Sequence, residues 1–170
     1  IWGRQFIDHI QITAAEEIGI EGRSNFYEGM GALRDIVQSH LLQLLLVTTM
    51  EAPEIMDSAH IHAEKLAVLQ AIQPIKASHV DEQAIRGQYL GYAAETGNRA
   101  SKVETFMALK LEVSNSRWGG VPILLRTGKA MAKKMTEISV VFRDRSRRNL
   151  PPNILTIRIQ PDEGITLHMM

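Results

Sequence analysis

The sequence predicts an α+β fold, in which a large, mostly antiparallel sheet is packed with helices. Helical spacing of apolar residues dominates residues 31–72, whereas apolar and polar residues come close to alternating in the segments after residue 105. Helices followed by a run of strands are typical of the α+β class. The connectors NSRWGG and RNLPPN are short and turn-like, which favours antiparallel neighbours, because parallel strands need a long crossover.

The first half of the chain contains one predicted strand and two predicted helices. Residues 9–15 (HIQITAA) partly alternate, which favours a strand, and the polar, glycine-containing segment 18–31 is predicted to be a loop. Residues 31–50 and 60–72 are predicted to form helices, because their apolar residues recur three and four positions apart. Each of these helices is followed within three residues by a proline, which cannot continue it.

The second half is predicted to be mainly strands. Residues 86–102 are rich in glycine and alanine and are predicted to be a loop or an irregular excursion. The strand candidates that follow come close to period two. They are residues 106–113, 122–130, 137–142 and 154–160, and the end of the chain, ITLHMM, is also strand-like.

Composition bounds the class of protein and its partners. The 170 residues include 19 Lys and Arg against 19 Asp and Glu, so the net charge is zero and gives no general attraction to nucleic acid or to an anionic membrane. The longest apolar run, residues 41–47, is far shorter than the ~20 residues that span a bilayer. The chain has no cysteine, which excludes disulfides and fits a reducing cytoplasm. The length suits one domain, and neither end has the features of a natural terminus, so we expect a piece of a longer chain.

His40 is the main candidate for a catalytic residue. A histidine on an apolar helical stripe is either a buried core residue with one hydrogen bond or a neutral imidazole that can take a proton near pH 7. Asp35 would be ~140° around an α-helix from His40 and ~7.5 Å along it, so the two side chains are not expected to bond each other but could reach one ligand. The predicted stripe comprises Leu33, Val37, His40, Leu44 and Val47.

Charged residues gather at other places along the chain. Glu16 follows the first predicted strand, where a carboxylate can accept hydrogen bonds from sugar hydroxyls or simply be solvated. Beside Gly128, which lets the backbone turn, several cations could clamp a phosphate or face solvent. These cations are Arg126, Lys129, Lys133 and Lys134. A further group is interpreted as a solvated loop and comprises Arg143, Arg145, Arg147 and Arg148.

Several common motifs are absent from the sequence. No GxGxxG follows a predicted strand, so no dinucleotide fingerprint is present, and there is no GxSxG. His60 and His62 lie at a helix start without a matching carboxylate pattern, so no metal site is predicted. From the residues alone, the sequence indicates an α+β domain with one notable histidine.

Three stretches of the chain, taken in order, resemble glucose-6-phosphate dehydrogenase. The first contains the family's RDxxQxHLLQ helix, whose fixed positions are Arg34, Asp35, Gln38, His40, Leu41, Leu42 and Gln43. The stretches are EGRSNFYEGMGALRDIVQSHLLQLLLVTTMEAP (21–53), RWGGVPILLRTGKAMAKKMTEISVVF (117–142) and LTIRIQPDEGI (155–165). The resemblance implies the C-terminal, substrate-binding and dimer-forming domain of a cytoplasmic enzyme that oxidises glucose 6-phosphate to its lactone with NADP.

The resemblance covers only part of that enzyme. It implies that the NADP-binding Rossmann domain is absent, together with the DHYLGKE signature that helps to bind the phosphate, so residues 1–170 are expected to be a single-domain fragment that is inactive alone. The implied partners are glucose 6-phosphate and further copies of the chain, as a dimer or tetramer, with no nucleic acid and no membrane. One alternative stays open, a noncatalytic oligomerisation or regulatory module derived from this domain.

The resemblance also implies roles for individual residues. His40 matches the general base that removes the proton from the anomeric hydroxyl of the sugar. The matched substrate contacts are the carboxylates Glu16 and Asp35, the basic residues Lys129 and Lys134, and Gln160.

A second, structural NADP site occurs in animal relatives and is not expected in this chain. Arg126 and Arg158 match two basic contacts of that site. However, Met135, Thr166 and His168 stand where those relatives have lysine, tyrosine and lysine.

Overall fold

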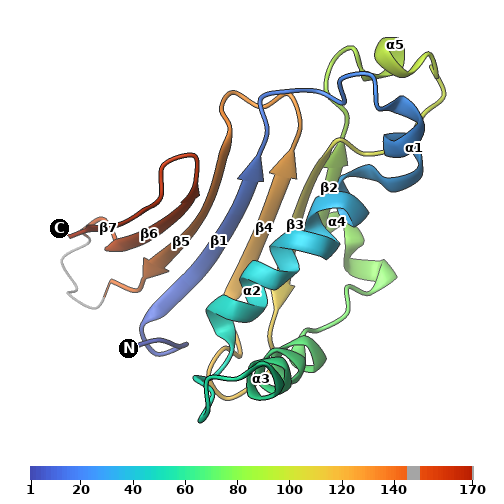
Figure 1. Ribbon diagram of the computed structural model, residues 1–170. Helices are drawn as coiled ribbons and strands as arrows, with labels where there is room; N and C mark the ends of the chain where they lie inside the picture. Colours follow the sequence, from blue (N-terminus) through green and yellow to red (C-terminus); the bar gives the residue numbers. More distant parts are fainter. Residues whose placement is uncertain (145–149, 170) are drawn as a thin grey trace.

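The computed structural model describes residues 1–144 and 150–169, and in this part of the chain seven strands form one sheet with helices on one of its faces (Figure 1). The strand order is β2-β3-β4-β1-β5-β6-β7. Neighbouring strands are antiparallel except β1 and β4, which are parallel, so the predicted α+β class with a mostly antiparallel sheet is confirmed. The strands are β1 (Ile7–Ala15), β2 (Ala84–Gly87), β3 (Phe106–Glu112), β4 (Pro122–Gly128), β5 (Met135–Phe142), β6 (Ile154–Gln160) and β7 (Gly164–His168).

The central strand β1 has two different faces. Ile10 and Ile12 are fully buried and pair in register with Ile123 and Leu125 of β4, on the face that the helices cover. Gln11 alternates with them and lies on the opposite, open face. The chain between β1 and β4 holds the helices of the described residues, and this long crossover allows the two strands to be parallel.

Three consecutive helices and a fourth beside them form the helical layer. The predicted helices over 31–50 and 60–72 are confirmed, but the first is not uniform, because η1 is a π-helix. Segment 18–31, predicted as a loop, instead contains α1, which Gly31 separates from η1 with φ 67° and ψ 170°. No helix in the described ranges combines the length and the apolar character needed to cross a membrane. The helices are α1 (Ser24–Ala32), η1 (Leu33–Leu41), α2 (Leu42–Thr49) and α3 (Ser58–Ala71).

The π-helix changes which residues of this segment are buried. The amide of Leu42 bonds the carbonyl of Val37, five residues back rather than four, and the buried positions recur at Val37, Leu41 and Leu45. The apolar stripe predicted from α-helical spacing is therefore only partly correct, because Val37 is buried and Leu44 half-buried but Val47 is exposed. His40 is exposed, as is Leu33, so the interpretation of His40 as a buried core residue is wrong.

Two tryptophans cap the C-terminal end of α2. The indole of Trp118, which is fully buried, donates to the carbonyl of Thr49 at 2.7 Å, and that of Trp2 donates to Thr48 at 2.8 Å. These bonds satisfy carbonyls that the last turn of α2 leaves without helical partners. The two rings meet edge to face, with centroids 6.4 Å apart.

The segment between α3 and β3 is more ordered than predicted. Residues 86–102 were expected to be a loop or irregular, but β2 ends within them and a short helix follows. Ile20, Tyr27 and Tyr92 form a small second core, which joins this segment to α1. The additional elements are η2 (Ala77–His79), α4 (Val80–Gln83) and α5 (Tyr92–Thr96).

The predicted solvated loop falls largely outside the described residues. Arg145, Arg147 and Arg148 lie in the range that the structure does not describe. The Nε of Arg143 donates to the carbonyl oxygens of Arg4 and Ile7, at 3.2 and 3.0 Å, so this arginine is bonded to the start of the chain.

Candidate functional site

A cavity of about 480 Å³ lies between the helical layer and one end of the sheet, where β1 and β6 end and β5 begins. Four residues that the sequence predicts as site residues line it, namely Glu16, His40, Lys134 and Gln160. The remaining lining residues are Ala14, Ala15, Ile36, Ser39, Leu41, Gln43, Leu44 and Thr136.

Sheet register explains why residues far apart in sequence meet at this cavity. Glu16 follows the last residue of β1, Lys134 precedes the first residue of β5, and Gln160 is the last residue of β6. Because β5 is antiparallel to both β1 and β6, the C-terminal ends of β1 and β6 and the N-terminal end of β5 lie at the same end of the sheet. Thr136 pairs directly with Gln160, which fixes the depth of that side chain in the cavity.

His40 comes to the cavity from the helical side. It lies near the end of η1, whose buried residues Val37 and Leu41 anchor the helix against the core. Its imidazole makes no hydrogen bond or ion pair with any other described residue, which leaves a ring nitrogen available to a ligand. Ile36 and Leu44 line the cavity beside His40, so the wall of the cavity around the imidazole is partly apolar.

Glu16 and Lys129 form an ion pair next to the cavity. Lys129 does not line the cavity itself and is only 5% exposed. Its backbone amide donates to the carbonyl of Thr105, and the amide of Glu16 donates to the carbonyl of Gly128, each at 2.9 Å. A Cβ at Gly128 would lie 2.8 Å from Sδ of Met131 and 2.9 Å from Cδ2 of Phe106, so both side chains pack closely over this glycine.

Asp35, the other carboxylate predicted to bind the sugar, does not line the cavity. Burial raises the pKa of Tyr27, and the negative charge of Asp35 raises it further. The separation predicted for an α-helix does not apply to Asp35 and His40, because residues five apart in a π-helix are joined by its hydrogen-bonding pattern. Asp35 therefore lies on the same π-helix as His40, outside the cavity wall, and its charge acts on Tyr27.

Arg126 and Arg158 lie on the open face of the sheet, away from the cavity. Register places Arg126, Thr13, Glu137 and Arg158 in one row across β4, β1, β5 and β6. Both arginines are exposed, and the carboxylate of Glu137 stands between them in the row. A carboxylate in this position disfavours a shared phosphate site.

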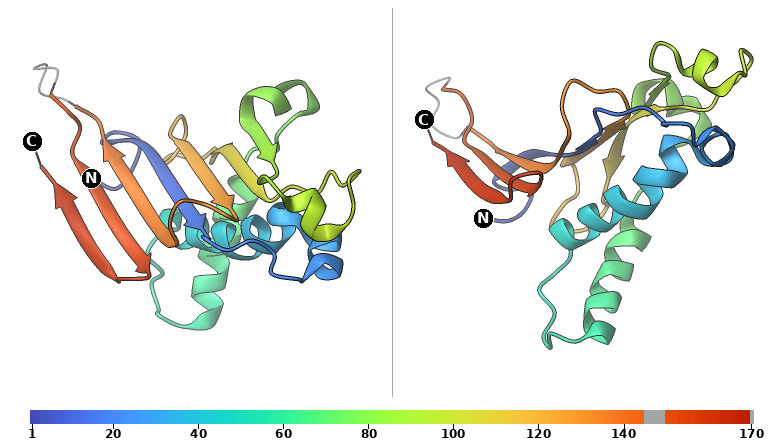
Figure 2. Two further views of the ribbon diagram at one scale, coloured as in Figure 1. Left: turned by 90° about the horizontal axis from the view of Figure 1, so that it is seen from above. Right: turned by 45° about the horizontal axis from the view of Figure 1, so that its top comes forward.

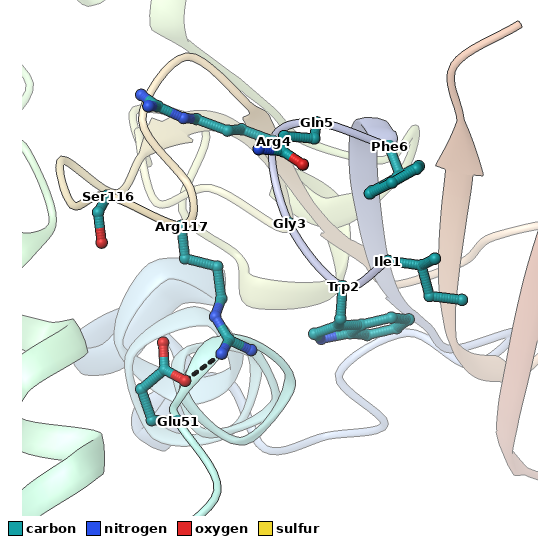
Figure 3. Close-up of a pocket in the computed structure, with 9 residues that line it drawn as sticks. All are labelled: Ile1, Trp2, Gly3, Arg4, Gln5, Phe6, Glu51, Ser116 and Arg117. Atoms are coloured by element: carbon teal, nitrogen blue, oxygen red, sulfur yellow. Dashed lines mark hydrogen bonds and ion pairs between the residues drawn. The ribbon is translucent and has the colours of Figure 1, made fainter. Parts of the chain in front are cut away.

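A separate hollow of about 350 Å³ lies beside the N-terminal segment (Figure 3). Arg117 and Glu51 form an ion pair on its wall, and Trp2 lies alongside. None of the predicted site residues lines this hollow.

Comparison with known proteins identifies the family of this chain. The profile of the family described as "Glucose-6-phosphate dehydrogenase, C-terminal domain" matches residues 1–170. The chain belongs to this family. The glucose-6-phosphate 1-dehydrogenases of Rhizobium meliloti (strain 1021) and Bacillus subtilis (strain 168) are 45% and 42% identical to it, over 100% and 99% of the chain. The chain spans 38% of the length of each of these two relatives.

Two solved structures of glucose-6-phosphate dehydrogenases are also similar. The X-ray crystal structure of the Mycobacterium avium glucose-6-phosphate 1-dehydrogenase matches with a TM-score of 0.90 and 40% identity, over 99% of this chain and 38% of that one. A structure described as glucose-6-phosphate dehydrogenase in complex with its substrate glucose-6-phosphate matches with a TM-score of 0.89 and 38% identity, over 98% of this chain and 36% of that one.

A glucose-6-phosphate dehydrogenase needs a nicotinamide cofactor, and the described residues form no cradle for one. Dinucleotide cradles use a glycine-rich turn that leads directly from a strand into a helix, where backbone amides face the pyrophosphate. Here β1 is followed by Glu16 and Glu17, and eight residues separate its end from α1. The turn after β1 therefore does not fit the pyrophosphate of a dinucleotide.

The sequence reasoning missed several residues of this glucose-6-phosphate dehydrogenase domain that the structure brings to the site. Ser39, Gln43 and Thr136 line the cavity beside the predicted residues. Tyr27 lies under Lys129, and Glu104 accepts a hydrogen bond from the amide of Leu33 at 2.9 Å, which satisfies the first turn of η1. Ser39 is adjacent to His40, and Gln43 follows it by three residues, so the sequence alone could have indicated that both lie near His40. The positions of Tyr27 and Glu104 depend on long-range contacts, which the sequence pattern does not reveal.

Proposed function

We propose that this chain is the sugar-phosphate-binding domain of a glucose-6-phosphate dehydrogenase and that His40 is its general base. The observation that carries the proposal is the convergence of His40, Glu16, Lys134 and Gln160 on one cavity. A similar protein of known structure is described as a complex with glucose-6-phosphate, which supports the same ligand for this chain.

His40 is suited to remove the proton of the anomeric hydroxyl. Its ring bonds no other described residue, so a nitrogen lone pair of the neutral imidazole can accept that proton. Proton removal while hydride leaves the same carbon forms the lactone carbonyl without an alkoxide intermediate. The hydride acceptor is NADP by the resemblance, and we propose that parts of the protein outside these residues hold it.

The other predicted residues are suited to orient the sugar phosphate. Lys134 brings a positive charge to the cavity wall, where it can pair with the phosphate. Glu16 and Gln160 offer acceptors and donors for sugar hydroxyls. Asp35 would reach the sugar from the helix that carries His40, and Lys129 would reach it from beside Glu16.

The proposal extends to the assembly and location of the whole protein. We propose a cytoplasmic homo-oligomer, a dimer or tetramer, with no nucleic acid or membrane as a partner. Zero net charge supports the lack of nucleic acid and membrane partners, and the lack of cysteine fits a reducing cytoplasm.

The test of the proposed function is turnover by the full-length product of the gene that contains this sequence. With glucose 6-phosphate and NADP, His40→Asn should lower kcat by about 10²- to 10⁴-fold, the contribution typical of a general base, with little change in KM. His62→Asn, on the exposed side of α3, is the matched control and should keep wild-type kinetics. Near wild-type turnover by His40→Asn would exclude the assignment of the base.

A second candidate function is a noncatalytic oligomerisation or regulatory module. Ile165 and Leu167, exposed apolar residues on the edge strand β7, suit a contact between subunits and favour this alternative. The upstream gene sequence separates the two candidates, because a GxGxxG turn after a strand and a DHYLGKE signature before Ile1 would exclude the module.

A further inference from the structure

The side chain of Lys129 rests on the ring of Tyr27. Its Nζ lies 5.4 Å from the ring centroid and also pairs with the carboxylate of Glu16, which lines the cavity. We propose that Tyr27 is a positioning residue of the sugar site, whose aromatic face holds the ammonium of Lys129 at the edge of the cavity beside Glu16. This inference rests on the proposed function, because it assigns Lys129 to sugar binding.

Burial of Lys129 explains why such a support is needed. Lys129 is 5% exposed, and a buried ammonium is costly unless charges or polar groups replace its water. Glu16 supplies one negative charge, and the negative face of an aromatic ring within about 6 Å supplies a second attraction. An ammonium has three donors, and Glu16 accepts from one of them, so two remain for a ligand.

The ring of Tyr27 is itself held firmly. Tyr27 is 2% exposed, its amide donates to the carbonyl of Arg23 at 3.0 Å, and its ring meets Tyr92 edge to face at 6.2 Å. The hydroxyl of Tyr92 in turn donates to Glu28 at 2.6 Å. A ring fixed on two sides can define the position of a flexible lysine, because the lysine stem has many rotamers and the ring has few.

The Tyr27 hydroxyl contributes less than the ring. Within the described residues the hydroxyl makes one long hydrogen bond, to the carbonyl of Glu104 at 3.5 Å. Burial and the charges of Asp35 and Glu104 raise its pKa, so the phenol stays neutral across the working pH range. The ring face, present in phenylalanine as well, is therefore the part expected to act on Lys129.

Substitutions in the full-length protein separate the ring from the hydroxyl. Tyr27→Phe keeps the ring and should leave KM for glucose 6-phosphate within about 2-fold of wild type. Tyr27→Leu keeps apolar bulk but removes the ring, and should raise that KM by about 3- to 30-fold while kcat changes less. Phe142→Leu, an aromatic truncation against the main core at the end of β5 opposite the cavity, is the matched control and should lower Tm without raising KM.

A double-mutant cycle tests whether Tyr27 acts through Lys129. In a Lys129→Met background, Tyr27→Leu should raise KM no further, because the ammonium that the ring holds is gone. Independent, additive increases in KM would overturn the proposal. An unchanged KM for Tyr27→Leu, alongside a raised KM for Lys129→Met, would also overturn it.

A nearly isosteric series covers the case in which Tyr27→Leu does not fold. Phenylalanines with one, two and three ring fluorines at position 27 withdraw electron density from the ring face with little change in volume. If the ring holds the ammonium, KM should rise stepwise with each fluorine; a flat series overturns the proposal. Wild-type protein without turnover would refute the proposed function and this inference together, whereas wild-type turnover with a flat series refutes this inference alone.

Discussion

Gly31 determines where the helix that carries Asp35 and His40 begins. Its φ of 67° and ψ of 170° lie in a region that is nearly restricted to glycine. A Cβ at this position would lie 2.5 Å from Oε1 of Glu104, the atom that accepts the amide hydrogen of Leu33. The backbone conformation and the close approach of Glu104 therefore both require glycine.

Gly31→Ala should lower the free energy of unfolding by about 1–3 kcal/mol, because it strains the backbone and displaces the carboxylate that satisfies the start of η1. Gly29→Ala is the matched control, since nothing lies within 4 Å of its added Cβ and alanine favours a helix. That control should be neutral or stabilising by up to about 1 kcal/mol. Urea denaturation of both variants measures the difference, and equal stabilities would contradict this explanation of Gly31.

Among the elements, those that present one regular face to the core could be predicted from the sequence. β1, α3 and the strands from β3 to β6 were predicted because their apolar residues alternate or recur at helical spacing. α1 was missed because Gly29 and Gly31 are typical of loops, whereas its stability comes from long-range packing of Tyr27 against Tyr92. The π-helix leaves no signature in residue types, so the face of His40 was assigned wrongly.

The candidate site shows the same limit. The types of Glu16, His40, Lys134 and Gln160 and the resemblance indicated a sugar site, but their meeting depends on sheet register. Local patterns also did not reveal that Lys129 is buried on a tyrosine ring, since its neighbours in the sequence RTGKAMAKK suggest a solvent-facing turn.

Glu28 joins the short helix α5 to α1. Its carboxylate accepts hydrogen bonds from the hydroxyls of Ser101 and Tyr92, each at 2.6 Å, and from the side-chain amide of Asn98 at 2.9 Å. The hydrogen bonds from Ser101 and then Tyr92 hold the pKa of Glu28 below its ordinary value of 4.5. A carboxyl whose pKa is lowered in the folded state stabilises that state above its unfolded pKa and loses this effect as the pH falls.

Glu28→Gln should therefore lower the free energy of unfolding at pH 7, because glutamine cannot carry the charge that these donors favour. As the pH falls below about 4.5, this free energy should decrease less steeply in the variant than in the wild type. Urea denaturation between pH 7 and pH 3 measures both effects. Glu17→Gln, at an exposed carboxylate after β1, is the control and should follow the wild-type pH dependence. A wild-type slope in Glu28→Gln would show that the three bonds do not depend on its charge.

At the scale of the whole molecule, the helices leave the side of the sheet formed by β6 and β7 uncovered. They lie over the side of the sheet that holds β3 and β4, whereas β6 and β7 extend beyond them (Figures 1 and 2). Ile165 and Leu167 of β7 are 74% and 53% exposed, and register aligns them with Ile157 and Leu155 of β6. β7 is also an edge strand, and an apolar edge strand favours association with another chain.

The isolated 170-residue chain should therefore self-associate through β7. Sedimentation velocity at rising concentration should give masses above the 19.0 kDa of one chain, and a variant with Ile165→Lys and Leu167→Glu should stay near that mass, because charges on an edge strand oppose pairing. Ile85→Lys on β2, at the other edge of the sheet and 64% exposed, is the control and should associate like the wild type. Association that survives the β7 substitutions and is lost in Ile85→Lys would contradict this prediction. The copies would then associate through β2, the edge strand at the opposite side of the sheet.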